Sequence, residues 1–147
     1  MRDAHVSRRR RWRADIEQRG AVTSPARRVG MSHPPPPATL LPHHKLFAYE
    51  LCLALVKLVA KTRVANAQLR AQARKSAASA ALNCAEGAAR QTRADKSRAY
   101  AIALCECCEA CAAIEIAGAL GACSAADVQA VVALGIRAKN IFSRLVR

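Results

Sequence analysis

Proline is absent after Pro42, and this absence constrains the fold of the remaining chain more than any other feature of the sequence. Proline in a helix interior removes a backbone hydrogen bond and clashes with the preceding turn. Alanine, the best helix former, recurs throughout the same stretch, and β-branched residues are sparse between Gln68 and Ala113. Because aromatic residues make up only 3% of the chain, we predict an all-α domain with a core of small side chains.

Hydrophobic periodicity predicts four helices within this stretch. They span about residues 45–61, 66–86, 92–117 and 124–145. In the first helix, the stripe predicted to face the core consists of Leu46, Tyr49, Leu53, Val56 and Ala60, widened by Leu51, Leu55 and Leu58. In the fourth helix, one face carries Val128, Val131, Gly135, Ala138, Phe142 and Leu145. The second helix is expected to stop at Gly87, since glycine commonly follows the last residue of a helix.

Two capping boxes mark the starts of the third and fourth helices. Thr92 is followed three residues later by Asp95, and Ser124 is followed in the same way by Asp127. In this motif the hydroxyl accepts from the N3 amide while the carboxylate accepts from the N-cap amide. The connections, including a glycine-containing turn at 118–123, are short. An up-down-up-down antiparallel four-helix bundle is therefore predicted for residues 44–147.

The segment before the bundle, residues 1–43, is predicted to be a disordered basic tail. Residues 1–30 are rich in arginine and have no hydrophobic pattern, so they bury too little apolar surface to offset chain entropy. A short polyproline spacer follows at 34–37. An alternative is that translation starts at Met31 and that the first thirty residues are a gene-calling artefact.

The charge balance favours a polyanionic partner. The chain has 24 Lys and Arg against 10 Asp and Glu, a formal net charge of +14, and the excess persists after residue 30. Nucleic acid is the first candidate partner, and a solvated basic surface is the alternative. No stretch approaches the ~20 apolar residues of a membrane-spanning helix. No apolar segment follows the N-terminal arginines as in a secretory signal, so we expect a cytoplasmic protein without membrane contact.

The candidate nucleic-acid-binding residues are cations on the second helix and around the start of the third. Arg70 and Arg74 share a helix face because they are i, i+4. The predicted contact set is Arg70, Arg74, Lys75, Arg90, Arg93 and Lys96, within a wider group that includes Lys57, Lys61, Arg63 and Arg98. Few aromatic side chains are available for stacking on bases, so contacts to the phosphate backbone are expected.

The cysteines and carboxylates give weaker signals. Cys105, Cys107, Cys108 and Cys111 form a C-x-C-C-x-x-C cluster, for which soft-metal binding, redox sensing and packing as small apolar residues all remain open. We favour packing and predict no metal site and no cofactor, because no histidine joins the cluster. No nucleophile–base pair or glycine-rich phosphate loop is present, and we expect no enzymatic activity.

The second helix carries a recognisable motif. Gln72-Ala73-Arg74-Lys75-Ser76-Ala77-Ala78-Ser79 precedes Asn83-Cys84-Ala85-Glu86-Gly87-Ala88-Ala89-Arg90. This resembles the hallmark of the 23S rRNA intervening-sequence family, Q-x-R-R-A-x-x-S-x-x-x-N-I-A-E-G-x-x-R. Downstream, Ala103, Glu109 and Leu120-Gly121 also match the family, whereas Cys105-Glu106 replaces its Gly-Ser pair. The resemblance covers about residues 45–147.

The resemblance implies a four-helix bundle that assembles into a homo-oligomer, a pentameric ring. It also implies structural roles for the motif residues Gln72, Ser79, Asn83, Glu86, Gly87 and Glu109. A ligand site at Asn83, Glu86 and Arg90 is the alternative to a register-fixing network there. A related protein is the accessory factor of diversity-generating retroelements, which binds nucleic acid and a reverse transcriptase. The leading expectation is thus a nucleic-acid-binding accessory protein, and the alternative is a protein–protein interaction scaffold.

Overall fold

The computed structural model describes residues 40–147. A short 3-10 turn, η1 (Pro42–Lys45), precedes four helices. The helices are α2 (Phe47–Lys61), α3 (Ala67–Ala89), α4 (Arg93–Ala119) and α5 (Ala125–Leu145). Residues 40–147 contain no strand, which confirms the predicted all-α class. The predicted tail, residues 1–43, lies almost entirely outside the described residues.

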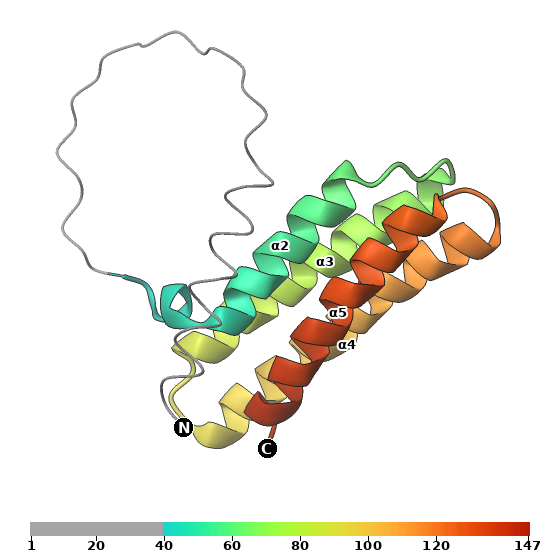
Figure 1. Cartoon of the computed structure of the whole chain (residues 1–147). Helices are drawn as coiled ribbons and strands as arrows, with labels where there is room; N and C mark the ends of the chain where they lie inside the picture. Colours follow the sequence, from blue (N-terminus) through green and yellow to red (C-terminus); the bar gives the residue numbers. More distant parts are fainter. Residues whose placement is uncertain (1–39) are drawn as a thin grey trace, which may run out of the picture. The chain divides into compact units, whose positions relative to one another are not determined.

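The four helices form an antiparallel bundle with up-down-up-down topology (Figure 1). Each helix packs against its neighbour in the chain, and α5 returns to pack against α2, which closes the bundle. The contact between α3 and α4 is the most extensive of those between described helices. This architecture confirms the predicted four-helix bundle.

Side-chain caps begin three of the helices. The Thr92 hydroxyl accepts from the Asp95 amide at 3.1 Å, and the Ser124 hydroxyl accepts from the Asp127 amide at 3.1 Å. Each hydroxyl also donates to the carboxylate of its aspartate, whereas the capping-box prediction had the carboxylate accept from the N-cap amide. Asn66 caps α3, and its side-chain oxygen accepts from an amide in the first turn at 3.0 Å.

Gly87 has a different role from the predicted one. The helix α3 continues through Gly87 to Ala89, so the expectation that it stops there was wrong. A Cβ at this position would lie 2.6 Å from Cε1 of Tyr100 on α4. Glycine is required at position 87 because α3 and α4 approach closely there. The turn that needs the conformational freedom of glycine is at Gly121, where φ is 68°.

The core combines a few large side chains with many alanines. Phe142, Leu51, Leu55 and Ile114 are the largest fully buried side chains. In α2 the buried residues are Ala48, Leu51, Cys52, Leu55 and Val59. The stripe predicted for this helix was therefore right only in part. Leu51 and Leu55, which widened it, are buried, but none of its five main members is buried, and two of them are exposed. Periodicity could not choose the core face, because α2 is apolar on both sides.

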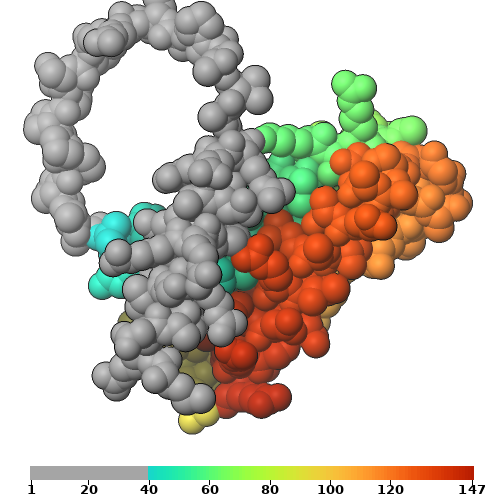
Figure 2. Space-filling model, in the orientation of Figure 1, coloured from blue at the N-terminus to red at the C-terminus, as the bar shows by residue number. Residues whose placement is uncertain are grey.

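The face of the molecule shown in Figure 2 presents α5 along its length, in orange to red. The stripe predicted for α5 is confirmed at Val131, Gly135, Ala138 and Phe142, which are buried.

No helix in the described part of the chain combines the length and apolar character needed to cross a membrane.

Candidate nucleic-acid interface

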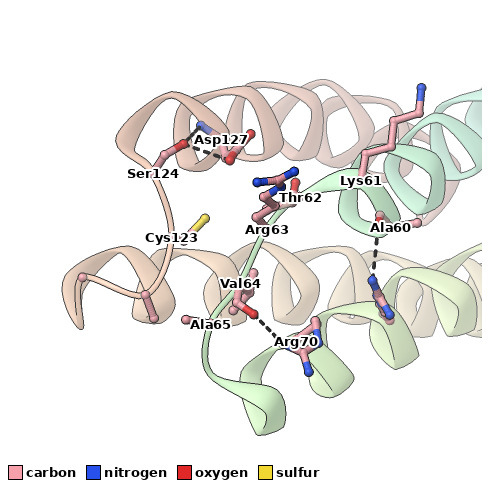
Figure 3. A pocket seen from close by; sticks show the side chains of 13 residues that line it. Ala60, Lys61, Thr62, Arg63, Val64, Ala65, Arg70, Cys123, Ser124 and Asp127 are labelled. Carbon is pink, nitrogen blue, oxygen red and sulfur yellow. Dashed lines mark hydrogen bonds between the residues drawn. The ribbon is translucent and has the colours of Figure 1, made fainter.

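One end of the bundle carries a pocket with a volume of about 700 Å³. It lies where the loop between α2 and α3 meets the loop between α4 and α5 (Figure 3). The amide of Ala65 donates to the carbonyl of Ala122 at 2.8 Å, so a backbone hydrogen bond joins the two loops. The pocket is thus assembled from segments that are far apart in the sequence.

The charged residues that line the pocket are mostly cations. Lys61 is the last residue of α2, Arg63 is in the following loop, and Arg70 and Arg74 lie on the first turns of α3. The lining contains one carboxylate, that of Asp127, whose oxygen accepts from Ser124 at 2.9 Å. Four cations and one carboxylate therefore line the same pocket, so the positive field there exceeds the negative one.

Two of these cations are held in place by the backbone. Arg70 donates from a terminal guanidinium nitrogen to the carbonyl of Val64 at 2.6 Å. Arg74 donates to the carbonyl of Ala60, in the last turn of α2, at 3.2 Å. The first bond attaches α3 to the loop that follows α2, and the second attaches it to the C-terminal end of α2, where positive charge also complements the helix dipole. A guanidinium has five N–H donors, so each arginine keeps donors for a ligand.

The six cations predicted from the sequence divide between the two ends of α3. Arg90 and Arg74 are separated by sixteen helical steps, or about 24 Å. Arg90 forms an ion pair with Glu86, and Arg93 donates to the backbone carbonyl of Arg147 at 2.6 Å. Arg90, Arg93 and Lys96 consequently form a second basic group at the turn between α3 and α4.

Lys61 and Arg63 belonged only to the wider predicted group of cations and not to the contact set, although they complete the pocket. Both side chains are exposed, and neither donates a hydrogen bond to another described residue. Their position at and just after the C-terminal end of α2 was the available signal for the contact set. Lys75 was predicted as a contact but is not among the residues that line the pocket.

Family comparison agrees with the helical architecture and the motif on α3. The family model described as "23S rRNA-intervening sequence protein" matches residues 46–143, which include α2, α3 and α4 entirely and all of α5 except its last two residues. The chain belongs to this family. No curated protein matches the chain in sequence.

The family's polar motif residues lie along one side of α3, next to α4. The side-chain amide of Gln72 donates to Glu109 on α4 at 2.7 Å and to Ser76 at 3.4 Å. Two residues that the family resemblance singled out on separate helices are therefore in direct contact. This hydrogen bond connects α3 to α4 across their seam.

The remaining motif residues pair within α3. The Asn83 amide donates to the backbone carbonyl of Ser79 at 2.9 Å and to its hydroxyl at 3.3 Å. Glu86 pairs with Arg90, and both of these side chains are exposed. The described contacts therefore join Asn83 to Ser79 rather than to Glu86, as separate pairs along one stripe.

The predicted cysteine cluster is split by the bundle. Cys107 and Cys111 are buried, whereas Cys105 and Cys108 are exposed, and all seven cysteines of the chain are free. The neighbouring thiols of Cys107 and Cys84, together with burial, raise the pKa of the Cys52 thiol on α2. Within residues 40–147, no three His, Cys, Asp or Glu side chains form a group that could hold a metal ion.

Proposed function

We propose that this chain is a non-catalytic homo-oligomeric bundle in the cytoplasm that binds the phosphate backbone of RNA or DNA as an accessory factor. The observation that carries the proposal is the group of four cations, Lys61, Arg63, Arg70 and Arg74, around one pocket with a single carboxylate. Arginine and lysine neutralise phosphates and release their counterions, which supplies affinity that does not depend on base sequence. The net charge of +14 adds long-range attraction to any polyanion.

The composition of the pocket supports backbone contact over base recognition. None of its lining residues is aromatic, so it has no platform on which bases could stack. Four phosphate contacts correspond to a slope of about −3 to −4 in a plot of log affinity against log salt concentration for duplex DNA. We expect RNA and DNA to bind with similar strength.

Exposed apolar side chains on α3, on α4 and at the end of α4 support self-association. Leu82 is 71% exposed, Ile102 42%, Ile116 50% and Leu120 66%. Large apolar side chains mark a protein interface where they gather into one exposed patch, and association of two copies would remove such a patch from water. A ring of identical subunits would cover this surface and repeat the basic pocket once per subunit. The pentameric stoichiometry rests on the family resemblance.

Light-scattering mass, followed by binding of labelled RNA and duplex DNA at two salt concentrations, tests the proposal. An oligomer that binds both and releases them at higher salt is expected. A monomer would refute the self-association, and the Leu82→Asp variant should shift a wild-type oligomer toward monomer. Binding that does not change with salt would refute the phosphate-contact mechanism.

A second candidate function is a protein–protein scaffold. The same four cations could dock an acidic protein surface, and the apolar residues on α3 and α4 could bind a different protein rather than a second copy. A stable oligomer that ignores both RNA and DNA at low salt would favour the scaffold. Binding of both nucleic acids would exclude it as the main function of the basic pocket.

A further inference from the structure

We propose that the pocket formed by Lys61, Arg63, Arg70 and Arg74 is a binding site for a phosphomonoester group. This inference goes beyond backbone binding, because a phosphodiester within a strand carries one negative charge, whereas a phosphomonoester carries about −1.5 to −2 at pH 7. The two classes of phosphate therefore make different demands on a site. The site stands or falls independently of whether the chain binds nucleic acid.

The charge balance of the pocket fits a dianion. Four cations and the carboxylate of Asp127 leave an excess of about three positive charges. The other acidic group of the lining is the thiol of Cys123, whose pKa is raised, mainly by burial and also by Asp127. This thiol therefore stays protonated near neutral pH and adds no negative charge. A single monoanionic phosphodiester would leave more of the excess uncompensated.

The donors divide into a fixed pair and a free pair. The guanidinium groups of Arg70 and Arg74 are oriented by backbone carbonyls, so they lose little conformational entropy on binding a ligand. Arginine suits phosphate because its planar fork can donate two parallel hydrogen bonds to adjacent oxygens. Lys61 and Arg63 donate to no other described residue, so their N–H groups remain for the ligand. In Figure 3 the Arg63 side chain lies between the loop and Asp127.

The rest of the lining explains why the phosphate, and not the group attached to it, would be recognised. Ala60, Val64, Ala65, Gly121 and Ala122 supply apolar side chains or backbone. The hydroxyl of Thr62 donates to the carbonyl of Leu58 at 3.0 Å and is engaged within the protein. The cations thus dominate the polar chemistry, and different phosphomonoesters should bind with similar affinity.

Calorimetric titration of the full chain tests the site. The probes are adenosine monophosphate, inorganic phosphate, and a dinucleoside monophosphate that has an internal phosphodiester and no terminal phosphate. We expect one saturable site per chain for the first two probes and at least tenfold weaker binding of the third. Equal binding of adenosine monophosphate and the dinucleoside monophosphate, or no saturable binding of either, would overturn the proposal.

Two charge-matched double variants assign the binding to this pocket. Lys61→Ala with Arg63→Ala should weaken adenosine monophosphate binding at least tenfold, and it should leave the helical circular dichroism unchanged. Arg98→Ala with Arg144→Ala removes two exposed cations that do not line the pocket, and it should change the affinity less than twofold. Equal losses in the two variants would show a general field effect and would overturn the site.

A third comparison identifies where the phosphomonoester comes from. An oligonucleotide labelled at its 3′ end is measured with a 5′-phosphate and with a 5′-hydroxyl. A preference for the 5′-phosphate of tenfold or more, together with binding of adenosine monophosphate, assigns the site to a nucleic-acid end. Equal binding of the two oligonucleotides, with the mononucleotide still bound, assigns it to a free phosphorylated molecule. Salt-sensitive RNA binding without a mononucleotide site would refute this inference and leave the proposed function standing.

Discussion

The Gly135→Ala substitution is expected to destabilise the bundle, although alanine is the better helix former. A Cβ at Gly135 on α5 would lie closer than 3.0 Å to Sγ of Cys111 on α4, a distance that real Cβ atoms essentially never show. Cys111 is only 8% exposed, and its thiol donates to the carbonyl of Val131 at 3.8 Å, so it has little room to move. The steric conflict with the Cys111 sulfur is therefore expected to determine whether the added methyl group stabilises or destabilises the bundle.

The magnitude follows from two opposing contributions. Overpacking a core costs about 1–3 kcal/mol. Replacing a glycine in a helix by alanine returns about 1 kcal/mol. Gly135→Ala should therefore lower the free energy of unfolding by up to about 2 kcal/mol. Cys111→Ala alone should lower it by about 1 kcal/mol, since it removes one small buried group.

The double variant separates this mechanism from general damage to the helix. The next atom near the added Cβ is the Cβ of Cys111 at 3.7 Å, an ordinary contact. Gly135→Ala with Cys111→Ala should therefore unfold close to wild type, with a coupling energy of about 1–3 kcal/mol in the double-mutant cycle. Urea unfolding followed by far-ultraviolet circular dichroism, at one protein concentration, measures this coupling. Strictly additive effects of the two substitutions would refute the reasoning.

Four further predictions concern the caps, the thiols and the pocket. Thr92→Ala should destabilise the bundle by about 1 kcal/mol in urea unfolding, because α4 loses its N-cap, and an unchanged unfolding midpoint would show that the cap is energetically silent. Alkylation at pH 8 of the native protein should modify the exposed Cys105 and Cys108 before Cys111, as read by mass spectrometry of peptides. Burial raises the pKa of the Cys111 thiol from 9.0 to about 12, so its stabilising contribution is complete below pH 9 and is lost as the pH rises toward 12. The urea midpoint should fall over that range, and less so in Cys111→Ala. Asp127→Asn should strengthen phosphate binding severalfold by removing the only carboxylate of the pocket, and weaker binding would contradict the charge argument.

The elements that local chemistry determines were predictable from the sequence. The caps at Thr92 and Ser124 depend on residues three positions apart, and the structure confirms both helix starts. The core face of α2 depends on which neighbours it packs against, and an apolar pattern on both sides contained no such information. Gly87 was misassigned for the same reason, since the ring of Tyr100 that requires it lies on another helix.

The candidate site was predictable only in part. Arg70 and Arg74 were identified because their spacing places them on one helix face. The pocket itself forms where two loops that are far apart in the sequence come together. The hydrogen bond from Ala65 to Ala122 joins these loops. Lys61 and Arg63 gain their significance only from that meeting. The six predicted cations lie at opposite ends of α3 because this helix is long enough to separate them.

The fully buried alanines of α3 and α4 also restrict how this chain can change during evolution. Ala73, Ala77 and Ala80 on one helix, and Ala103 and Ala110 on the other, have no exposed surface. A larger residue at these positions must force the helices apart, and glycine costs about 1 kcal/mol in helix propensity. At these positions, neutral substitution is thus limited to the few residue types whose side chains are close to alanine in volume. Most sequence divergence among related chains should instead accumulate on the outward stripes, where the surface that meets a partner can be rebuilt without disturbing the bundle.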